Sequence, residues 1–252
     1  KGVHSYDFTY LSYAEAGLSP EDAWHLAYYV VSLQEAPRWN SSARATYVEG
    51  ALPDSLDDPR WNGVEWTDVR LRNVVSVEGT WAAPPTVNLV SLQVLFNDEA
   101  VAFRLRWDDP SQDRGGSSDA FALLLRPAEA QGDVITLQAW PYVGAPPLDI
   151  CSWSAETGTA GEVVAEGFER GTPRRGLEAA LHSAARYDDG GQWQMVLQRP
   201  FRRERPEGAA EIASEGVTAV AFAIWDGGTP GQRAVSSWVD VILAEVSQTN
   251  RR

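Results

Sequence analysis

Four aspartates stand close together near the middle of the sequence, after a run of alternating apolar residues. They are Asp108, Asp109, Asp113 and Asp119. Hard cations such as Ca²⁺ bind several oxygens at once, so these side chains could gather around one calcium ion. Their spacing matches no calcium-binding loop, and aspartate also caps turns by accepting hydrogen bonds from nearby backbone N–H groups. The sequence favours turn capping, with a calcium site as the alternative.

Side chains that ligate iron or act as nucleophiles are few. Cys151 is the only cysteine, so the sequence has neither an internal disulfide nor a cysteine pair that attaches haem covalently. The only methionine, Met195, alternates with Trp193 and Leu197, which predicts a core position. The sequence contains no GxSxG, phosphate-loop or HExxH motif. We therefore expect a protein that is not an enzyme.

The charge balance argues against two classes of partner. The 252 residues carry 35 Asp and Glu against 21 Lys and Arg, which gives a formal net charge of -14 and a pI of about 4.6. Nucleic-acid phosphates and anionic membrane surfaces repel such a chain. Its apolar runs are shorter than the roughly 18 residues that a membrane span needs, and no signal peptide is recognised, as expected of a mature or truncated product.

Turn residues predict hairpins in the second half of the chain. Asn97, Asp98 and Glu99 separate the runs 90–96 and 100–107. The second run alternates between a predicted core face and a predicted exposed face, namely Val101, Phe103, Leu105 and Trp107 against Ala102, Arg104 and Arg106. Residues 188–191, Asp-Asp-Gly-Gly, join two more predicted strands, 177–187 and 192–201.

The amino-terminal segment has helical signals instead. Ser19, Pro20, Glu21 and Asp22 provide an N-cap, a first-turn proline and acids at the positive end of the helix dipole. An apolar stripe continues to Leu33. We therefore divide the chain into a helical segment, 1–36, and a β domain, 37–252.

Several separated motifs, in order along the chain, resemble one known family. They are WDDP (107–110), YVGAPPLDICSW (142–153), QWQMVLQRPF (192–201), and FAIWDG (222–227) with SSW (236–238). The family is that of the haem b subunits of periplasmic molybdenum oxidoreductases, the ethylbenzene dehydrogenase gamma-subunit type. The segment 17–33, GLSPEDAWHLAYYVVSL, is similar to the last helix of a class I cytochrome c.

The resemblance implies a fold and a cofactor. The fold would be mainly β, an antiparallel β-sandwich related to family 9 carbohydrate-binding modules, with a short helical segment at its start. The cofactor would be haem b, and the family's axial methionine and lysine fall at Val143 and Arg233. Since neither side chain replaces those ligands, Met195 and His182 are the leading candidates, while Arg233 could pair with a haem propionate. The expected pocket residues are Trp140, Tyr142, Val143, Trp153, Met195, Arg233 and Trp238.

The resemblance also implies a role. The chain would be the electron-transfer subunit of a multi-subunit molybdenum oxidoreductase of the DMSO reductase family. It would associate with a catalytic molybdenum subunit and an iron–sulfur subunit in the periplasm or another extracytoplasmic compartment. Two alternatives stay open: a structural or assembly subunit of such a complex that has lost its haem, and a carbohydrate-binding module. In the latter, Trp and Tyr faces would stack on sugar rings.

Overall fold

The computed structural model describes most of the β domain. The described residues are Ser19, 42–73, 86–125, Leu137, Trp140, 146–167, 170–173, 181–201, Ala210, 212–229 and 233–243. The chain divides into two compact units, Lys1–Pro37 and Arg38–Arg252. Only Ser19 of the first unit is described, so the helical segment and its likeness to a cytochrome c helix lie outside the described residues and stay predictions. No helix in the described part of the chain is long and apolar enough to cross a membrane.

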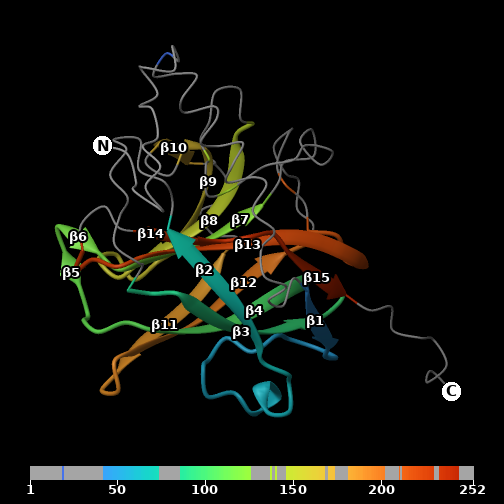
Figure 1. The fold of residues 1–252 in the computed structure, drawn as a ribbon. Helices are drawn as coiled ribbons and strands as arrows, with labels where there is room; N and C mark the ends of the chain where they lie inside the picture. Colours follow the sequence, from blue (N-terminus) through green and yellow to red (C-terminus); the bar gives the residue numbers. More distant parts are fainter. Residues whose placement is uncertain are drawn as a thin grey trace, which may run out of the picture. The chain divides into compact units, whose positions relative to one another are not determined.

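Strands supply most of the regular structure of the described residues (Figure 1). In chain order they are β1 (Ser42–Tyr47), β2 (Thr67–Asn73), β3 (Leu89–Phe96), β4 (Ala100–Asp108), β5 (Arg114–Gly115), β6 (Ser117–Ser118), β7 (Ala120–Leu125), β8 (Leu148–Ser154), β9 (Ala160–Gly167), β10 (Arg170–Pro173), β11 (His182–Asp188), β12 (Gln192–Pro200), β13 (Gly216–Trp225), β14 (Arg233–Ser236) and β15 (Val239–Leu243). A short 3-10 helix, η1 (Pro59–Trp61), lies between β1 and β2.

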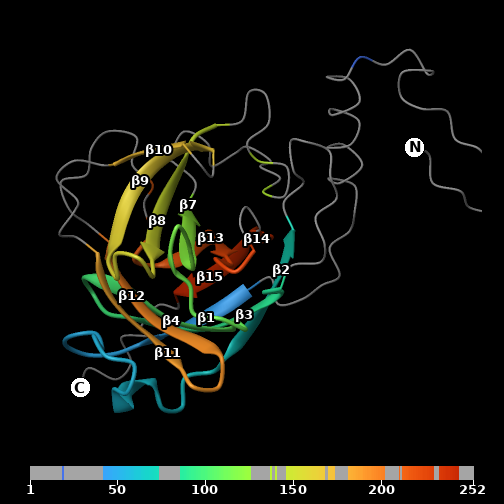
Figure 2. The same ribbon diagram turned by 90° about the vertical axis from the view of Figure 1, so that its left-hand side faces the viewer.

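The strands form two facing layers (Figure 2). One layer has the order β10-β9-β8-β7-β13 and the other has the order β2-β3-β4-β12-β11. Neighbours within each layer are antiparallel. The two layers are joined because β14 pairs with both β13 and β2, and because β15 pairs with β13 and with β1, which also pairs with β3. The predicted antiparallel β-sandwich is therefore confirmed.

The space between the layers holds the main core. Successive side chains of a strand point to opposite faces, so core residues alternate along each strand. β4 contributes Val101, Phe103, Leu105 and Trp107, and β12 contributes Trp193, Met195 and Leu197, all at most 2% exposed. The core face predicted for β4 is thus confirmed. Ala102 was expected on an exposed face but is buried, because Leu52, Leu56 and Trp61 cover that end of the layer.

Both predicted hairpins are present, and the second one reaches the site described below. In the first, Asn97 Oδ1 accepts hydrogen bonds from the backbone N–H groups of Glu99 and Ala100. In the second, Gly191 has a φ of 77°, a conformation that glycine adopts without steric cost. Its carbonyl accepts a 2.9 Å hydrogen bond from the Asp109 backbone N–H. The β11–β12 turn therefore holds the residue that follows β4.

One charged side chain occupies a core-facing position. Arg199 continues the alternation of β12 and is fully buried. One of its terminal nitrogens lies 3.2 Å from Glu162 Oε1 on β9 and donates a 2.7 Å hydrogen bond to the Ala210 carbonyl. A buried ion pair therefore links β12 of one layer to β9 of the other.

Candidate functional site

The described residues among those expected to line a haem pocket lie in different parts of the fold. Trp153 and Met195 lie in the core between the layers, where Trp153 packs edge-on against Trp193 with 5.0 Å between ring centroids. Trp140 and Trp238 belong to a second apolar cluster, on the opposite face of the β7-β8-β13 layer.

Of the remaining residues of that set, only Arg233 is described. Arg233 begins β14, opposite Trp225 of β13. Tyr142 and Val143 lie outside the described residues. His182, the other candidate iron ligand, is exposed at the start of β11, with Nε2 3.3 Å from the Asp54 carbonyl oxygen. Met195 is 0% exposed between Leu105 and Ala185 on the adjacent strands. The described candidates for the haem site therefore belong to two separate apolar clusters or lie at the start of a strand.

Three buried carboxylates instead converge at one end of the sandwich. Asp109 follows β4, Asp119 precedes β7 and Asp226 follows β13. Ala120 pairs with Trp225, which brings the strand ends that carry Asp119 and Asp226 side by side. One carboxylate oxygen from each of the three residues lies within 4.8 Å of the other two. We call Asp109, Asp119 and Asp226 the acidic centre.

The carboxylate of Asp119 is held by hydrogen bonds from three directions. Its Oδ1 accepts from the Gly227 backbone N–H at 2.9 Å. Its Oδ2 accepts from the Asp113 backbone N–H at 2.8 Å and from Trp193 Nε1 at 3.0 Å. Trp193 is a core residue of the other layer, so Asp119 is fixed against both layers and is 0% exposed.

The other two carboxylates have fewer donors. Asp226 Oδ1 accepts from the Gly228 backbone N–H at 2.8 Å, and Asp226 Oδ2 accepts from Thr86 Oγ1. Asp109 Oδ1 accepts from the Ser111 backbone N–H at 3.2 Å. Asp109 Oδ2 has no hydrogen-bond partner although the residue is 0% exposed. One carboxylate oxygen of the acidic centre is therefore buried and unpaired.

The electrostatics of the acidic centre follow from burial and like charge. Burial, together with the nearby charges of Asp119, Asp226 and Asp113, raises the pKa of Asp109 to about 7 against the lowering effect of the Ser111 hydrogen bond. Among the described residues, no arginine, lysine or histidine forms an ion pair with the acidic centre. The arrangement is suited to holding a cation.

The sequence analysis grouped two members of this centre but favoured turn capping over a cation site. Asp109 and Asp119 do lie together, while Asp108 faces the outer side of its layer and Asp113 Oδ2 accepts a 2.6 Å hydrogen bond from Ser111 Oγ. Asp226 was missed, because it is far away in sequence and only the pairing of β13 with β7 brings it near. The available signal was its position directly after a strand, which it shares with Asp109.

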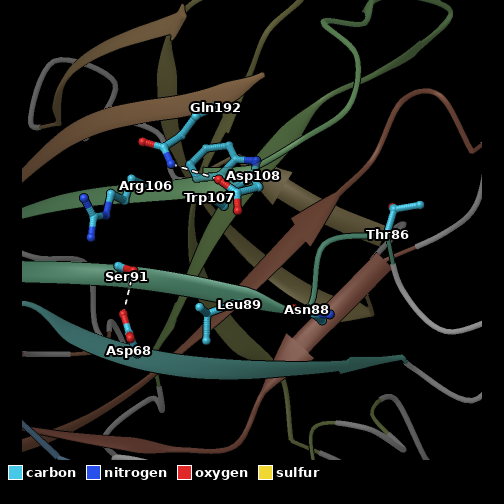
Figure 3. A pocket seen from close by; sticks show the side chains of 9 residues that line it. All are labelled: Asp68, Thr86, Asn88, Leu89, Ser91, Arg106, Trp107, Asp108 and Gln192. Atoms are coloured by element: carbon cyan, nitrogen blue, oxygen red, sulfur yellow. Dashed lines mark hydrogen bonds between the residues drawn. The ribbon is translucent and has the colours of Figure 1, made fainter. Parts of the chain in front are cut away.

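A polar pocket opens on the outer face of the β2-β3-β4-β12 layer (Figure 3). One of its residues, Thr86, donates a hydrogen bond to Asp226 of the acidic centre. The pocket has a volume of about 540 Å³, within the range of roughly 300–1,000 Å³ common for small-ligand sites. It is lined by Asp68, Thr86, Asn88, Leu89, Ser91, Arg106, Trp107, Asp108 and Gln192. These nine residues define the polar pocket.

The strand register assembles this pocket. Asp68 of β2 stands opposite Ser91 of β3, and Ser91 stands opposite Arg106 of β4. Asp108 of β4 stands opposite Gln192 of β12. Sequence alternation placed Arg106 on an outer face but gave no register between strands, so these residues were not recognised as a site.

The pocket keeps both donors and acceptors available. Ser91 Oγ donates to Asp68 Oδ1 at 2.6 Å, and Gln192 Nε2 donates to Asp108 Oδ1 at 2.9 Å (Figure 3). The second oxygen of each carboxylate has no hydrogen-bond donor among the described residues. The Arg106 guanidinium lies over the Trp66 ring, with Cζ 4.1 Å from the ring centroid, and donates to no acceptor in the described part of the chain. Hydrogen-bonding groups of both kinds therefore face the pocket unpaired.

Comparison with known proteins gives a likeness of fold. No protein-family model matches the chain, and no curated protein matches it. It is similar to a family 9 carbohydrate-binding module from Caldicellulosiruptor kristjanssonii solved with glucose, with 10% identity, a TM-score of 0.49, and coverage of 83% of this chain and 99% of the module. For the same organism's family 9 module with cellotriose, the identity is 10%, the TM-score 0.47, and the coverage 82% and 96%. A likeness at these values says nothing about the ligand of this chain.

The identification as a haem b subunit is wrong. The structures found are family 9 carbohydrate-binding modules and not haem-binding gamma-subunit domains. The described residues also separate the members of the predicted haem pocket, because Trp153 and Met195 fill the core. The predictions of haem b as cofactor and of a cytochrome or respiratory-chain role are wrong as well, because they depended on that family. The predicted association with a molybdenum subunit and an iron–sulfur subunit stays a prediction, since only one chain is described.

Proposed function

We propose that this chain is a non-catalytic carbohydrate-binding module that binds a neutral sugar in the polar pocket. The observation that supports this proposal is the pairing of unsatisfied acceptors on Asp68 and Asp108 with unsatisfied donors on Arg106 in one concavity. A sugar hydroxyl both donates and accepts hydrogen bonds, so a polyhydroxylated ligand can satisfy both kinds of group at once. The amides of Asn88 and Gln192 add further donors and acceptors.

The charge of the pocket favours a neutral ligand. Two carboxylates, Asp68 and Asp108, face one guanidinium, Arg106, within a chain whose formal net charge is -14. Phosphorylated or strongly acidic ligands would therefore be repelled. A cationic ligand would be opposed at close range by the Arg106 guanidinium, which lines the pocket. A neutral polyol meets neither obstacle.

The apolar part of the pocket is small, which shapes the expected recognition. Leu89 is 39% exposed and offers a surface for the C–H face of a sugar ring, whereas Trp107 is only 2% exposed. Trp61, Trp140, Trp153 and Trp193 are buried as well, so these tryptophans serve the cores and do not provide stacking platforms. Hydrogen bonding, rather than ring stacking on tryptophan, would supply most of the selectivity.

Arg106 is prepared for this role by Trp66. A guanidinium stacked on an aromatic ring is held in one plane, so less side-chain freedom is lost when a ligand binds. The planar fork of Arg106 can then donate to two neighbouring hydroxyls. A protein of this function would act outside the cytoplasm, where polysaccharides are met, and the periplasm is one such compartment.

Isothermal titration calorimetry with neutral sugars tests the proposal. The panel contains hexoses, pentoses and β-linked glucose oligomers, titrated into the full chain and into the variants Arg106→Ala and Asp68→Asn. Arg44→Ala is the control, because Arg44 is exposed on β1 and does not line the pocket. We expect Kd to rise about tenfold or more in both pocket variants, since a hydrogen bond to a charged group contributes about 1.5–3 kcal/mol. No binding by the wild type, or equal binding by all variants, would contradict the proposal.

A further inference from the structure

The acidic centre lies outside the polar pocket and is a second site. The geometry points to a binding site for a hard divalent cation, with Ca²⁺ preferred, formed by the carboxylates of Asp109, Asp119 and Asp226. This inference goes beyond the proposed sugar binding and does not depend on it.

The spacing of the carboxylates fits one shared ion. Calcium–oxygen distances are about 2.3–2.6 Å, so two oxygens on opposite sides of one Ca²⁺ are roughly 4.6–5.2 Å apart. Oxygens of the three residues lie within 4.8 Å of one another. All three can therefore belong to a single coordination sphere.

The unpaired oxygen of Asp109 is an independent indication. Asp109 is 0% exposed, and its Oδ2 accepts no hydrogen bond. Buried polar atoms are nearly always satisfied, and a buried charge without a partner is costly. By contrast, both oxygens of Asp119 and both of Asp226 have donors. The oxygen that lacks a donor thus belongs to the carboxylate that faces two others, where a cation would satisfy it.

The donor set selects among metals. All three ligands are carboxylates, which suit hard cations, whereas Zn²⁺ and copper sites commonly use imidazole or thiolate. Mg²⁺ requires a near-octahedral arrangement at about 2.0–2.1 Å, while Ca²⁺ accepts irregular geometry and 6–8 oxygens. The ligands here come from the ends of three strands in two layers, an irregular arrangement that suits Ca²⁺ best.

Two glycines let the loop after β13 close over this centre. A Cβ at Gly227 would lie 2.5 Å from Asp113 Cβ, 2.8 Å from the Ser117 carbonyl oxygen and 2.9 Å from the Asp119 backbone nitrogen. A Cβ at Gly228 would lie 2.9 Å from Ser111 Oγ. The sequence Asp-Gly-Gly therefore allows Asp226 to approach Asp119 at a distance that larger residues would prevent.

Terbium luminescence provides the test. Tb³⁺ takes the oxygen ligands of Ca²⁺ and luminesces when a nearby indole is excited, and Trp193 Nε1 is 3.0 Å from Asp119 Oδ2. The full chain is treated with a chelator, exchanged into chelator-free buffer without sugar, and titrated with Tb³⁺. We expect saturable luminescence on tryptophan excitation that excess Ca²⁺ abolishes and the same concentration of Mg²⁺ does not. Absence of this signal, or a signal insensitive to Ca²⁺, would overturn the inference.

Variants locate the ion. Asp109→Asn should weaken Ca²⁺ binding, measured by calorimetry, by more than about tenfold, because ligand charge tunes calcium affinity over decades. Asp240→Asn is the control, since Asp240 is exposed on β15, and it should bind as the wild type does. Asp226→Asn should weaken Ca²⁺ binding in the same way, because it removes the charge of a second ligand, and this locates the ion even if Asp109→Asn fails to fold. Wild-type affinity in a folded Asp109→Asn or Asp226→Asn variant would place the ion elsewhere and overturn the inference.

Discussion

Thr86 Oγ1 donates a hydrogen bond to Asp226 Oδ2. Thr86 lines the polar pocket, and Asp226 belongs to the acidic centre. Asp108 and Asp109 provide a second connection, because adjacent residues of the chain face the pocket and the acidic centre respectively. The two proposed sites therefore share a wall, and occupation of one is expected to affect the other.

We predict that Ca²⁺ and sugar bind cooperatively, and that Thr86→Val weakens this coupling. A cation at the acidic centre fixes Asp226 and thereby the position of Thr86 in the pocket wall. Coupling between two sites is commonly 5–150-fold, so the wild type should bind sugar at least about fivefold more tightly with Ca²⁺ than with chelator. In Thr86→Val this factor should fall toward one.

Calorimetry with and without Ca²⁺ measures the coupling directly. Thr46→Val is the matched control, because Thr46 is exposed on β1 outside the pocket. Coupling is reciprocal, so sugar must tighten Ca²⁺ binding by the same factor. An equal Ca²⁺ effect on sugar affinity in the wild type and in Thr86→Val would show that the hydrogen bond does not carry it.

Gly227→Ala should destabilise the fold, whereas Gly161→Ala should not. The Cβ at position 227 would meet backbone atoms of Ser117 and Asp119 at 2.8 and 2.9 Å, and these cannot move as a flexible side chain can. Forcing extra volume into a packed site costs about 1–3 kcal/mol. At Gly161 on β9 no atom lies within 4 Å of the new Cβ, so the change should be neutral or stabilising by up to about 1 kcal/mol. Urea unfolding compares the free energies of unfolding of the two variants, provided that their m-values are equal. Equal stability of the two variants would contradict the close approach of Gly227 to Ser117 and Asp119.

Asp58 should titrate at an unusually low pH. Side-chain hydrogen bonding from Arg60, followed by the hydrogen bond from the Arg60 backbone N–H, lowers the pKa of Asp58 from 3.8 to about 2. Arg60 Nε lies 2.8 Å from Asp58 Oδ1, and the backbone nitrogen lies 2.9 Å from the same atom. Because the pKa is lowered on folding, the interaction stabilises η1 fully above pH 3.8 and is lost as the pH falls through about 2.

Carboxyl chemical shifts from an NMR pH titration report this midpoint. In Arg60→Gln the side-chain donor group is changed to a neutral amide, and the midpoint of Asp58 should move toward 3.8. A wild-type midpoint at the ordinary value, or no change in Arg60→Gln, would show that the ion pair does not form in solution.

The motifs behind the haem resemblance correspond to structural positions of the sandwich. Residues 192–201 form β12 and its end, where Trp193, Met195 and Leu197 face the core. Residues 222–227 end β13 and carry Asp226 into the acidic centre. Such apolar alternation and turn chemistry specify strands and their ends. The resemblance therefore predicted the layers correctly and the cofactor wrongly. The residues that carry it are largely core residues, whose types are determined by packing and not by a ligand.

Strand register is the information that the sequence did not provide. Alternation alone placed Arg106 on an outer face, but Asp68, Ser91 and Arg106 become one row only through the pairing of β2 with β3 and β3 with β4. Asp226 likewise reaches Asp119 only through long-range pairing. Shifting one strand by a single residue would turn these side chains to the other face, so sites built across strands need the register as well as the pattern.

The buried ion pair between Arg199 and Glu162 should be the most sensitive polar contact in the core. Both side chains are 0% exposed, and they join opposite layers at 3.2 Å. Arg199→Met removes the ion-pair partner that the buried Glu162 carboxylate has on β12, so it should lower the free energy of unfolding by about 3–5 kcal/mol. The double variant Arg199→Met with Glu162→Gln should recover part of this loss, because the remaining group is then neutral.

Arg186→Met is the matched control. Arg186 pairs with Asp57 at 3.0 Å, but the two side chains are 48% and 70% exposed. Exposed ion pairs contribute only about 0–1 kcal/mol to stability. Urea unfolding of the three variants measures these costs. A cost for Arg199→Met no larger than that for Arg186→Met would mean that the core tolerates the loss of the buried ion pair.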